Sequence, residues 1–235
     1  MILESSLTWK KHISGLASKI SRNAGILYKL KGLVPENVLK IVYNSLIQSH
    51  LNYCSNVWGL GSKSSISKIF TAQKKAVAVR AVENKFNNCY YNSETGELPC
   101  HTKEIFNRNN LLTIHNIIAK NCLASMHKIY LGTAPCNIAS LFGVNRVINP
   151  NSRRDPEYFR IPGSRLKALD KTLFFKGPRL YNNIANILNM EHVSALNTYS
   201  MFLNPFKNRI AKYFKSAQND DNIEWVEQNF PLYKV

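Results

Sequence analysis

Hydrophobic residues recur at helical spacing along most of the 235-residue chain. The first clear stripe begins at Trp9 and ends near Leu30, with apolar residues three, four and seven positions apart. This spacing predicts one apolar face of an α-helix. The members of the stripe are Trp9, Ile13, Leu16, Ala17, Ile20, Ala24 and Leu27. Gly32 follows the stripe and is expected to end the helix.

Three further helices are predicted in the first 130 residues. Pro35-Glu36 opens the second, with proline in the first turn and a carboxylate near the positive end of the helix dipole. We expect its buried face to be Val38, Ile41, Val42, Leu46 and Leu51. A glycine-rich turn at 59–62 precedes the third helix, at about 64–84. A polar loop is expected at 87–99, and the fourth helix runs over about 111–130 and is closed by Gly132.

The third predicted helix places two polar residues on its apolar face. Gln73 and Arg80 share this face with Ile66, Ile69, Phe70 and Val77. A buried arginine needs a carboxylate or carbonyl partner. The alternative is an arginine at the edge of the core that extends toward phosphate.

The C-terminal half is less regular until its last helix. Residues 143–172 contain Asn, Pro, Gly and Arg between short apolar pieces, which predicts loops or short strand pairs. Asn204-Pro205 is expected to begin the last helix as N-cap and first residue. The apolar face of that helix is Phe206, Ile210, Tyr213 and Phe214. The fold class is therefore mainly α, with a helical bundle followed by a mixed loop, short-strand and helical C-terminal segment.

Charge divides the chain into four segments. Lys and Arg number 31 against 14 Asp and Glu, so the net charge is +17. We expect a basic helical bundle at 1–86, a neutral helical segment packing on it at 87–142, a basic C-terminal segment at 143–217, and an acidic tail at 218–235. An excess of this size predicts a polyanionic partner, with nucleic acid favoured over an acidic membrane surface.

Several features predict an intracellular protein, nuclear or cytoplasmic. The five cysteines have irregular gaps and no C-x-x-C motif, which indicates a reducing compartment rather than a disulfide framework. The first residues do not form a secretory signal. The longest uncharged stretch, between Lys40 and Lys63, is interrupted by amide side chains, so no membrane span is expected.

The first predicted helix carries a basic stripe opposite its apolar one. Lys11, Lys19, Arg22 and Lys29 fall within about 80° of one another on a helical wheel. Surface helices usually mix both signs of charge, yet residues 5–35 contain no Asp or Glu. This favours contact with a phosphate backbone over an ordinary solvated face. Lys68, Lys74 and Lys75 of the third helix form a second candidate patch.

Residues for catalysis or metal binding are not found in a usable arrangement. Two-metal polymerase or nuclease chemistry needs clustered carboxylates, and the only adjacent acidic pair is Asp220-Asp221. Hydrolase and phosphate-loop signatures are missing as well. Cys89, Cys100, His101 and His115 are zinc-type ligands, but their spacing matches no finger or knuckle. We therefore expect no catalytic residue, metal or cofactor in this chain.

Short motifs along nearly all of residues 7–215 resemble, in order, the region just after the palm of reverse transcriptases from jockey-like non-LTR retrotransposons. The quoted segments are L-T-W-K-K-H-I at 7–13, G-I-L-Y-K-L-K-G-L-V-P at 25–35, Y-N-S-L-I-Q-S-H-L-N-Y-C-S-N-V-W-G at 43–59 and Q-K-K-A-V-A-V-R at 73–80. The series continues with His101-Thr102 and Phe106, then Arg165, F-K-G-P-R-L-Y-N at 175–182, and Phe206 with Lys207. Two positions depart from the family pattern. Tyr181 stands where the family has tryptophan. Ala78-Val79 lies where the family usually passes from Ala-Val directly to arginine, so the register of Arg80 differs.

The resemblance implies the thumb and adjoining C-terminal segment of an RNA-directed DNA polymerase. In that family the helical thumb grips the primer–template duplex, and the aspartates that bind Mg²⁺ belong to the palm. Nothing here matches the palm, so the chain is expected to be a truncated copy or the product of a gene model that starts late, and to be inactive alone. Its expected partners are an RNA–DNA hybrid or DNA duplex, and the missing palm.

Two alternatives come from other classes of protein. One is a non-enzymatic basic helical protein that binds a protein partner or an acidic membrane surface. The other is a non-functional remnant of the element, with apolar surface exposed where the palm would pack. Trp9 and Trp58 are the residues expected at such a surface.

Overall fold

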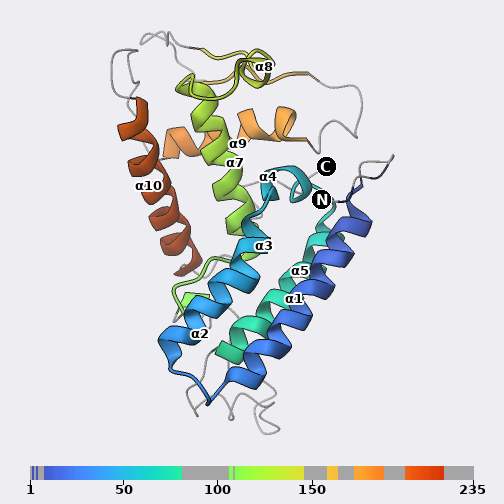
Figure 1. The fold of residues 1–235 in the computed structure, drawn as a ribbon. Coiled ribbons are helices and arrows are strands. Elements are labelled where there is room, and N and C mark those ends of the chain that lie inside the picture. The colour runs from blue at the N-terminus through green and yellow to red at the C-terminus, as the bar shows by residue number, and fades with distance from the viewer. Residues whose placement is uncertain are drawn as a thin grey trace, which may run out of the picture. The chain divides into compact units, whose positions relative to one another are not determined.

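The computed structural model describes residues 2, 4, 8–80, 106–107, 109–145, 158–163, 172–187 and 199–219. These residues form a mainly helical structure, as the hydrophobic spacing predicts (Figure 1). Strand-like pairing within them is limited to two isolated bridges, Lys31 with Val34 and Val144 with Phe159. The second bridge lies in the segment predicted to hold loops or short strands. The loop predicted at 87–99 lies outside the described residues.

The chain divides into two compact units. Unit 1 comprises Met1–Cys54, Gly61–Ile117 and Phe214–Asp221. Unit 2 comprises Ser55–Leu60, Ile118–Tyr213 and Asn222–Val235. The segment boundaries predicted after residues 86, 142 and 217 stay predictions, and the first of them lies outside the described residues.

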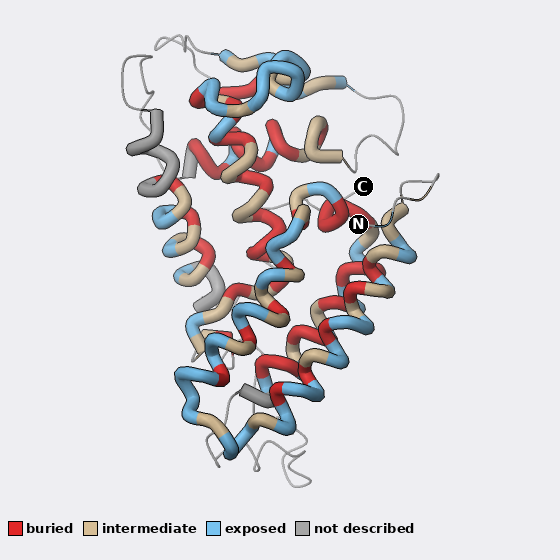
Figure 2. Tube along the Cα trace, viewed as in Figure 1, coloured by how far each residue is buried: buried red, intermediate tan, exposed pale blue. Residues whose placement is uncertain are grey.

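Helix α1 (Lys10–Leu30) begins and ends close to where its apolar stripe predicts. Five of the seven stripe residues are buried: Ile13, Leu16, Ile20, Ala24 and Leu27. Figure 2 shows these buried positions recurring along the helix between exposed ones. Just beyond the helix, Gly32 takes a φ of +82°, and the next two backbone N–H groups return to the carbonyl of Leu30. A residue without Cβ adopts this left-handed conformation at low cost, so Gly32 ends the helix as predicted.

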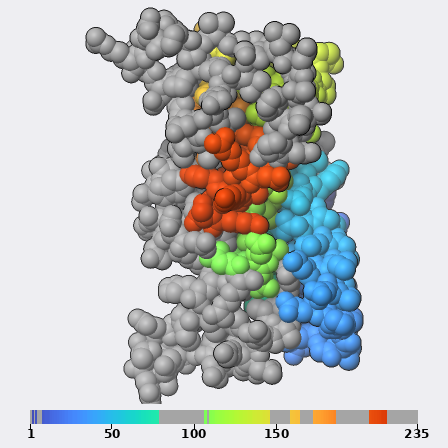
Figure 3. Space-filling view, turned by 90° about the vertical axis from the view of Figure 1, so that its left-hand side faces the viewer, coloured from blue at the N-terminus to red at the C-terminus, as the bar shows by residue number. Residues whose placement is uncertain are grey.

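Helix α2 (Glu36–Tyr43) starts after Pro35 as predicted and continues through a π-helical turn, η1 (Asn44–Gln48), into α3 (Ser49–Asn52). The predicted buried face was wrong for most of its members. Val38 and Ile41 are 41% and 67% exposed, and Val42 and Leu46 are only half-buried. Figure 3 shows α2 and the turn that follows it (blue) as part of the molecular surface.

The residues that the α2–η1–α3 segment buries instead are spaced four apart: Leu39, Tyr43, Ile47 and Leu51. In a regular α-helix each step of four residues overshoots a full turn by about 40°, so such a row would drift off one face. The wider i→i+5 turn of η1 compensates for this drift. The π-helical turn therefore decides which face is buried.

Helix α5 (Lys63–Arg80) packs along α1 within unit 1 (Figure 1). Gln73 is fully buried, as its place on the apolar face predicts. Its side-chain Nε2 donates to the carbonyl of Leu112 at 3.0 Å, and its Oε1 accepts from the N–H of Ile114 at 2.8 Å. Gln73 thus holds the start of the next helix, α7 (Ile114–Tyr130), by two backbone hydrogen bonds. The side chain of Arg80 lies outside the described residues.

In unit 2, helix α4 (Ser55–Trp58) is joined to α7 by side-chain hydrogen bonds. Asn121 donates to the Ser55 hydroxyl at 2.8 Å, and Asn56 donates to that of Ser125 at 2.9 Å. Trp58 is completely buried, so the expectation that it lies at an exposed apolar surface was wrong. Trp9 of unit 1 is half-buried.

Three features of the C-terminal half differ from the sequence prediction. They are helix α9 (Leu173–Ile187), a short helix α8 (Cys136–Ala139), and the start of α10 (Tyr199–Asn219). The first two were not predicted, because Gly177-Pro178 interrupts the helical pattern of α9 and α8 is a single turn. Asn204-Pro205 lies inside α10, so the predicted N-cap there was wrong. The apolar face of α10 is confirmed at its buried residues, Phe206, Ile210 and Phe214.

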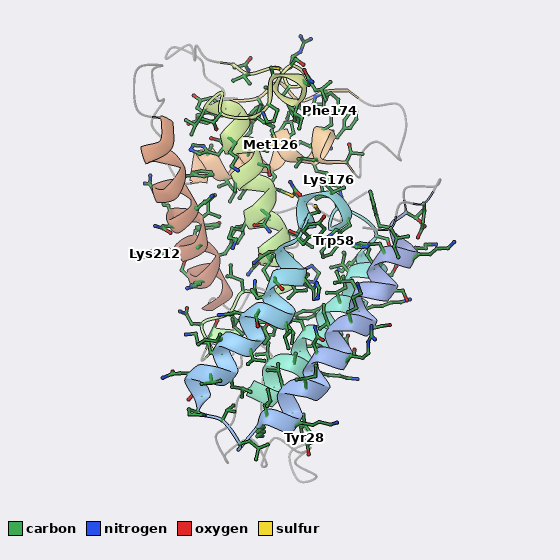
Figure 4. The ribbon with its side chains drawn as sticks, viewed as in Figure 1. Tyr28, Trp58, Met126, Phe174, Lys176 and Lys212 are labelled. Carbon is green, nitrogen blue, oxygen red and sulfur yellow. The ribbon has the colours of Figure 1, made fainter. Side chains whose placement is uncertain are left out.

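Close packing in unit 2 places α9 directly against α7. A Cβ on Gly177 would lie 2.6 Å from the sulfur of Met126. Figure 4 shows Met126 on α7 and Lys176 on the neighbouring α9. Five residues after Gly177, Asn182 accepts hydrogen bonds from the N–H groups of Tyr158 and Phe159 and donates one to the carbonyl of Phe159. This clamp fixes the isolated bridge segment on α9.

A buried polar pair stands among aromatic rings in unit 2. His127 and Tyr181 are 2% and 1% exposed, and the distance from Nδ1 to the hydroxyl oxygen is 2.7 Å. The ring of Phe206 stacks on that of His127, with centroids 3.7 Å apart. The hydroxyl of Tyr181 is thus the hydrogen-bond partner of the buried histidine.

Candidate nucleic-acid interface

The four cationic residues predicted on the first helix all lie at the surface of α1. Lys11, Lys19, Arg22 and Lys29 are exposed and lie opposite the buried stripe. We call these four residues the basic stripe. No carboxylate occurs along α1, so the charge of this face is of one sign. Helix α1 therefore presents a row of ammonium and guanidinium groups suited to phosphate oxygens.

One carboxylate lies close to the start of the basic stripe. Glu4 accepts hydrogen bonds from the hydroxyl of Thr8 and the backbone N–H of Lys11. These two bonds, with Lys11 and Lys10 as nearby charges, hold the pKa of Glu4 below its usual range. Glu4 therefore stays ionised and offsets part of the charge at the Lys11 end. The stripe is most positive toward Lys19, Arg22 and Lys29.

The second predicted patch divides in the structure. Lys68 and Lys75 lie one heptad apart on the exposed side of α5. Lys74 is half-buried, with its ammonium nitrogen 5.0 Å from the centre of the Phe70 ring. Phe70 also packs on Phe106 and His115. Lys74 thus covers an aromatic cluster, and Lys68 and Lys75 are the better candidates for phosphate contact.

A surface pocket that the sequence did not predict lies beside the basic stripe in unit 1. Its volume is about 280 Å³, and α1 and α3 supply most of its lining. His12 and Lys19 line it from α1, while His50 and Tyr53 line it from α3 and the residue after it. The heptad spacing of His12 and Lys19 places both on one side of α1. Their meeting with His50 depends on tertiary packing, which periodicity cannot reveal.

Burial of the imidazole is the main influence on His12. It lowers the pKa of this histidine, and nearby positive charge, including that of Lys19, lowers it further. The His12 ring is therefore neutral at physiological pH and gains a proton more readily when an anion is close.

Among the described residues, no three His, Cys, Asp or Glu side chains are grouped to hold a metal ion. Of the four zinc-type residues considered above, only His115 is described, and it packs edge-on against Phe70. Within the same described ranges, no helix is long and apolar enough to cross a bilayer.

Comparison with known proteins leaves the family of the chain open. A scan of family models found no match, and searches of curated proteins and of solved structures found no significant one. The resemblance to retrotransposon reverse transcriptases therefore stays a prediction that rests on the motifs quoted above.

Proposed function

We propose that the chain binds an RNA–DNA hybrid or DNA duplex through its phosphates, as the thumb-like part of a jockey-like retrotransposon reverse transcriptase. The observation that carries this proposal is the basic stripe, exposed along α1 with no carboxylate between residues 5 and 35. A duplex has a regular backbone, and a straight row of cations can follow it without reading bases. Binding is therefore tolerant of sequence.

The motif residues and the basic residues have separate tasks in this proposal. Gly59, Gln73, Gly177 and Asn182 belong to the quoted motifs, and each is buried at a close contact or a backbone hydrogen bond. They maintain the scaffold. The cations of the basic stripe, with Lys68 and Lys75, supply the contact with phosphate.

Catalysis belongs to the parent polymerase in this proposal. Nucleotide transfer needs carboxylates that hold Mg²⁺, and the sequence offers no such cluster. The chain alone binds a duplex and incorporates no nucleotide. Nucleotide incorporation by the purified chain, on a primer–template with Mg²⁺, would contradict this.

A salt titration tests the proposal. The four phosphate contacts of the basic stripe are expected to contribute a slope of roughly −3.6 to the fall of log K with log salt. Changing Lys11, Lys19, Arg22 and Lys29 together to Gln is expected to remove most of this slope. A slope near zero for the wild-type chain would refute duplex binding through phosphates.

A charge-matched variant controls for net charge. Lys128, Arg179, Arg209 and Lys212 are four exposed cations outside the basic stripe. Changing these four to Gln removes the same charge and is expected to leave most of the slope. Acidic phospholipid vesicles form a second arm. If the four-Gln variant of the basic stripe loses vesicle binding but binds the duplex as tightly as the wild-type chain does, the membrane-binding alternative replaces the proposal.

A further inference from the structure

The pocket beside the basic stripe gathers hydrogen-bond donors that suit one phosphate group. His12 and Lys19 come from α1, and His50 and Tyr53 come from α3 and the following turn. None of the described residues that line it is acidic. Imidazole, ammonium and phenol groups all donate to phosphate oxygens, and a charged donor gives the stronger bond.

The pocket and the basic stripe share one residue. Lys11, Arg22 and Lys29 fall within about 20° of one another on the α1 wheel, and Lys19 lies about 80° from Lys11, toward His12. His12 and Lys19 are themselves only about 20° apart. A strand that follows the basic stripe therefore passes the mouth of the pocket at Lys19.

Size and exposure match a single nucleotide unit. A volume of about 280 Å³ lies near the lower end of small-ligand sites, which begin at roughly 300 Å³. Tyr53 is 61% exposed and offers an aromatic face at the rim. Aromatic side chains beside a cationic groove stack on bases or sugars irrespective of sequence.

We propose that this pocket fixes one backbone phosphodiester of the bound nucleic acid, with Lys19, His12 and His50 as its donors and Tyr53 against the adjoining nucleoside. The inference rests on the proposed function and deepens it. The basic stripe attracts the duplex, and the pocket sets the register of the backbone along α1.

The state of His12 makes this site sensitive to pH. The backbone N–H of Ile2 approaches the His12 Nδ1 at 3.4 Å, so the neutral ring carries its proton on Nε2 and is a donor there. A phosphodiester stays anionic throughout the titration of histidine. Its charge raises the lowered pKa of His12, so the affinity increases as the pH falls.

The charges that act on His12 are those of the N-terminal amino group and of Lys19, both positive. Lys19 lies on the same helix, and His50 and Tyr53 face His12 from α3 and the turn. In the segment before α1, Glu4 bonds to Thr8 and to the Lys11 N–H. His12 is therefore the group whose change of charge makes binding depend on pH.

Filling the pocket without changing any charge is the decisive test. Gly15 lines the pocket, and a Cβ added there meets no atom within 4 Å. A leucine at this helical position extends toward the preceding turn, where His12 lies, and raises helix propensity. We expect Gly15→Leu to weaken binding of a 12-base-pair duplex by the full-length chain about tenfold, since one charge-assisted phosphate contact is lost.

Gly25→Leu is the matched control. Gly25 is an exposed glycine of α1, also with no atom within 4 Å of an added Cβ, and it borders the basic stripe outside the pocket. We expect its affinity to change less than twofold. Circular dichroism and thermal unfolding confirm that both variants fold.

The pH dependence provides the second readout. The wild-type chain is expected to bind the duplex several-fold more tightly at pH 5.5 than at pH 7.5 at fixed salt. The change of His12 to Gln is expected to flatten this profile.

The outcomes separate the two proposals. Equal affinities for wild type, Gly15→Leu and Gly25→Leu would overturn the pocket and leave the proposed function standing. If both leucine variants weaken duplex binding equally, the effect comes from added bulk on the helix, and the pocket proposal is overturned as well. Absence of any duplex binding by the wild-type chain at low salt would overturn both proposals.

Discussion

Gly59 occupies a position in unit 2 where no side chain fits. A Cβ there would lie 2.3 Å from the carbonyl oxygen of Ser55 and 2.6 Å from a side-chain carbon of Ile118. The first neighbour is backbone and cannot move aside without disturbing α4. The glycine of the W-G motif is thus explained by packing.

Replacing Gly59 with alanine is expected to lower the free energy of unfolding by about 1–3 kcal/mol, as overpacking does. Gly177→Ala is expected to cost less, because the flexible side chain of Met126 can shift. Urea denaturation measures both. Gly25→Ala is the control and is expected to stabilise the chain by up to about 1 kcal/mol through helix propensity. A neutral Gly59→Ala would contradict the packing explanation.

Gln73 shows why a polar residue stands on the apolar side of α5. Its side chain supplies both the donor and the acceptor that the backbone at Leu112 and Ile114 requires. Gln73→Met keeps a similar volume but leaves two buried backbone groups without these partners. We expect a loss of about 2–4 kcal/mol in the free energy of unfolding.

The matched variant for Gln73 is Lys75→Met on the exposed side of the same helix. It is expected to change stability by less than about 0.5 kcal/mol. If Gln73→Met had an equally small effect on stability, water or a rearranged backbone would have to supply hydrogen bonds to the carbonyl of Leu112 and the N–H of Ile114. That result would remove Gln73 from its anchoring role.

At the scale of the element, the π-helical turn η1 sets the phase of the helix that contains it. Leu39 and Tyr43 precede the turn, Ile47 lies within it, and Leu51 follows it on the same buried face. The exposed Ser45 lies inside the turn. Removing one residue there should restore a regular α-helix with these four residues spaced four, three and four apart, still on one face, whereas inserting one residue rotates everything after it by about 100°.

Insertion of one alanine after Ser45 is therefore expected to destabilise the chain by more than about 3 kcal/mol, because Ile47 and Leu51 rotate out of the core, whereas deletion of Ser45 keeps both on the buried face. Thermal unfolding followed by circular dichroism measures the change. Ser45→Ala keeps the length of the segment and is expected to be close to neutral. An insertion variant as stable as the wild-type chain would show that the phase set by the turn does not control the buried face.

At the scale of the whole molecule, alkaline pH is expected to weaken unit 2 in particular. Burial raises the pKa of Tyr213 and of Cys122 to about 12, and it raises those of Tyr158 and Tyr181 as well. All four residues belong to unit 2. Above their ordinary values of 9.0 for the thiol and 10.0 for tyrosine, the unfolded chain loses protons that the folded chain retains.

The stabilisation from these groups is complete below about pH 9 and is lost as the pH rises toward 12. We expect the urea midpoint to be constant between pH 7 and 9 and to fall progressively above that. Tyr213→Phe removes one titrating group and is expected to make the fall shallower. A midpoint that is flat to pH 11 would show that these hydroxyl and thiol groups reach water in the folded state.

Local patterns in the sequence determined much of the fold. The stripe and ends of α1, the start of α2 after Pro35, the buried side of α5 with Gln73, and the glycine that closes α7 were all predicted. Each depends on neighbours within one or two helical turns. The exposure of the basic stripe belongs to the same group, since it is the far side of a buried stripe.

Tertiary structure alone decided the remaining features. The buried face of α2 depends on the turn η1, and α9 stays helical through Gly177-Pro178 because it packs on α7. The pocket beside the basic stripe brings together His12 of α1 and His50 of α3, residues far apart in the sequence. Hydrophobic periodicity indicates which side of a single helix is buried. Packing between helices determines where that helix bends and which side chains from different helices come into contact.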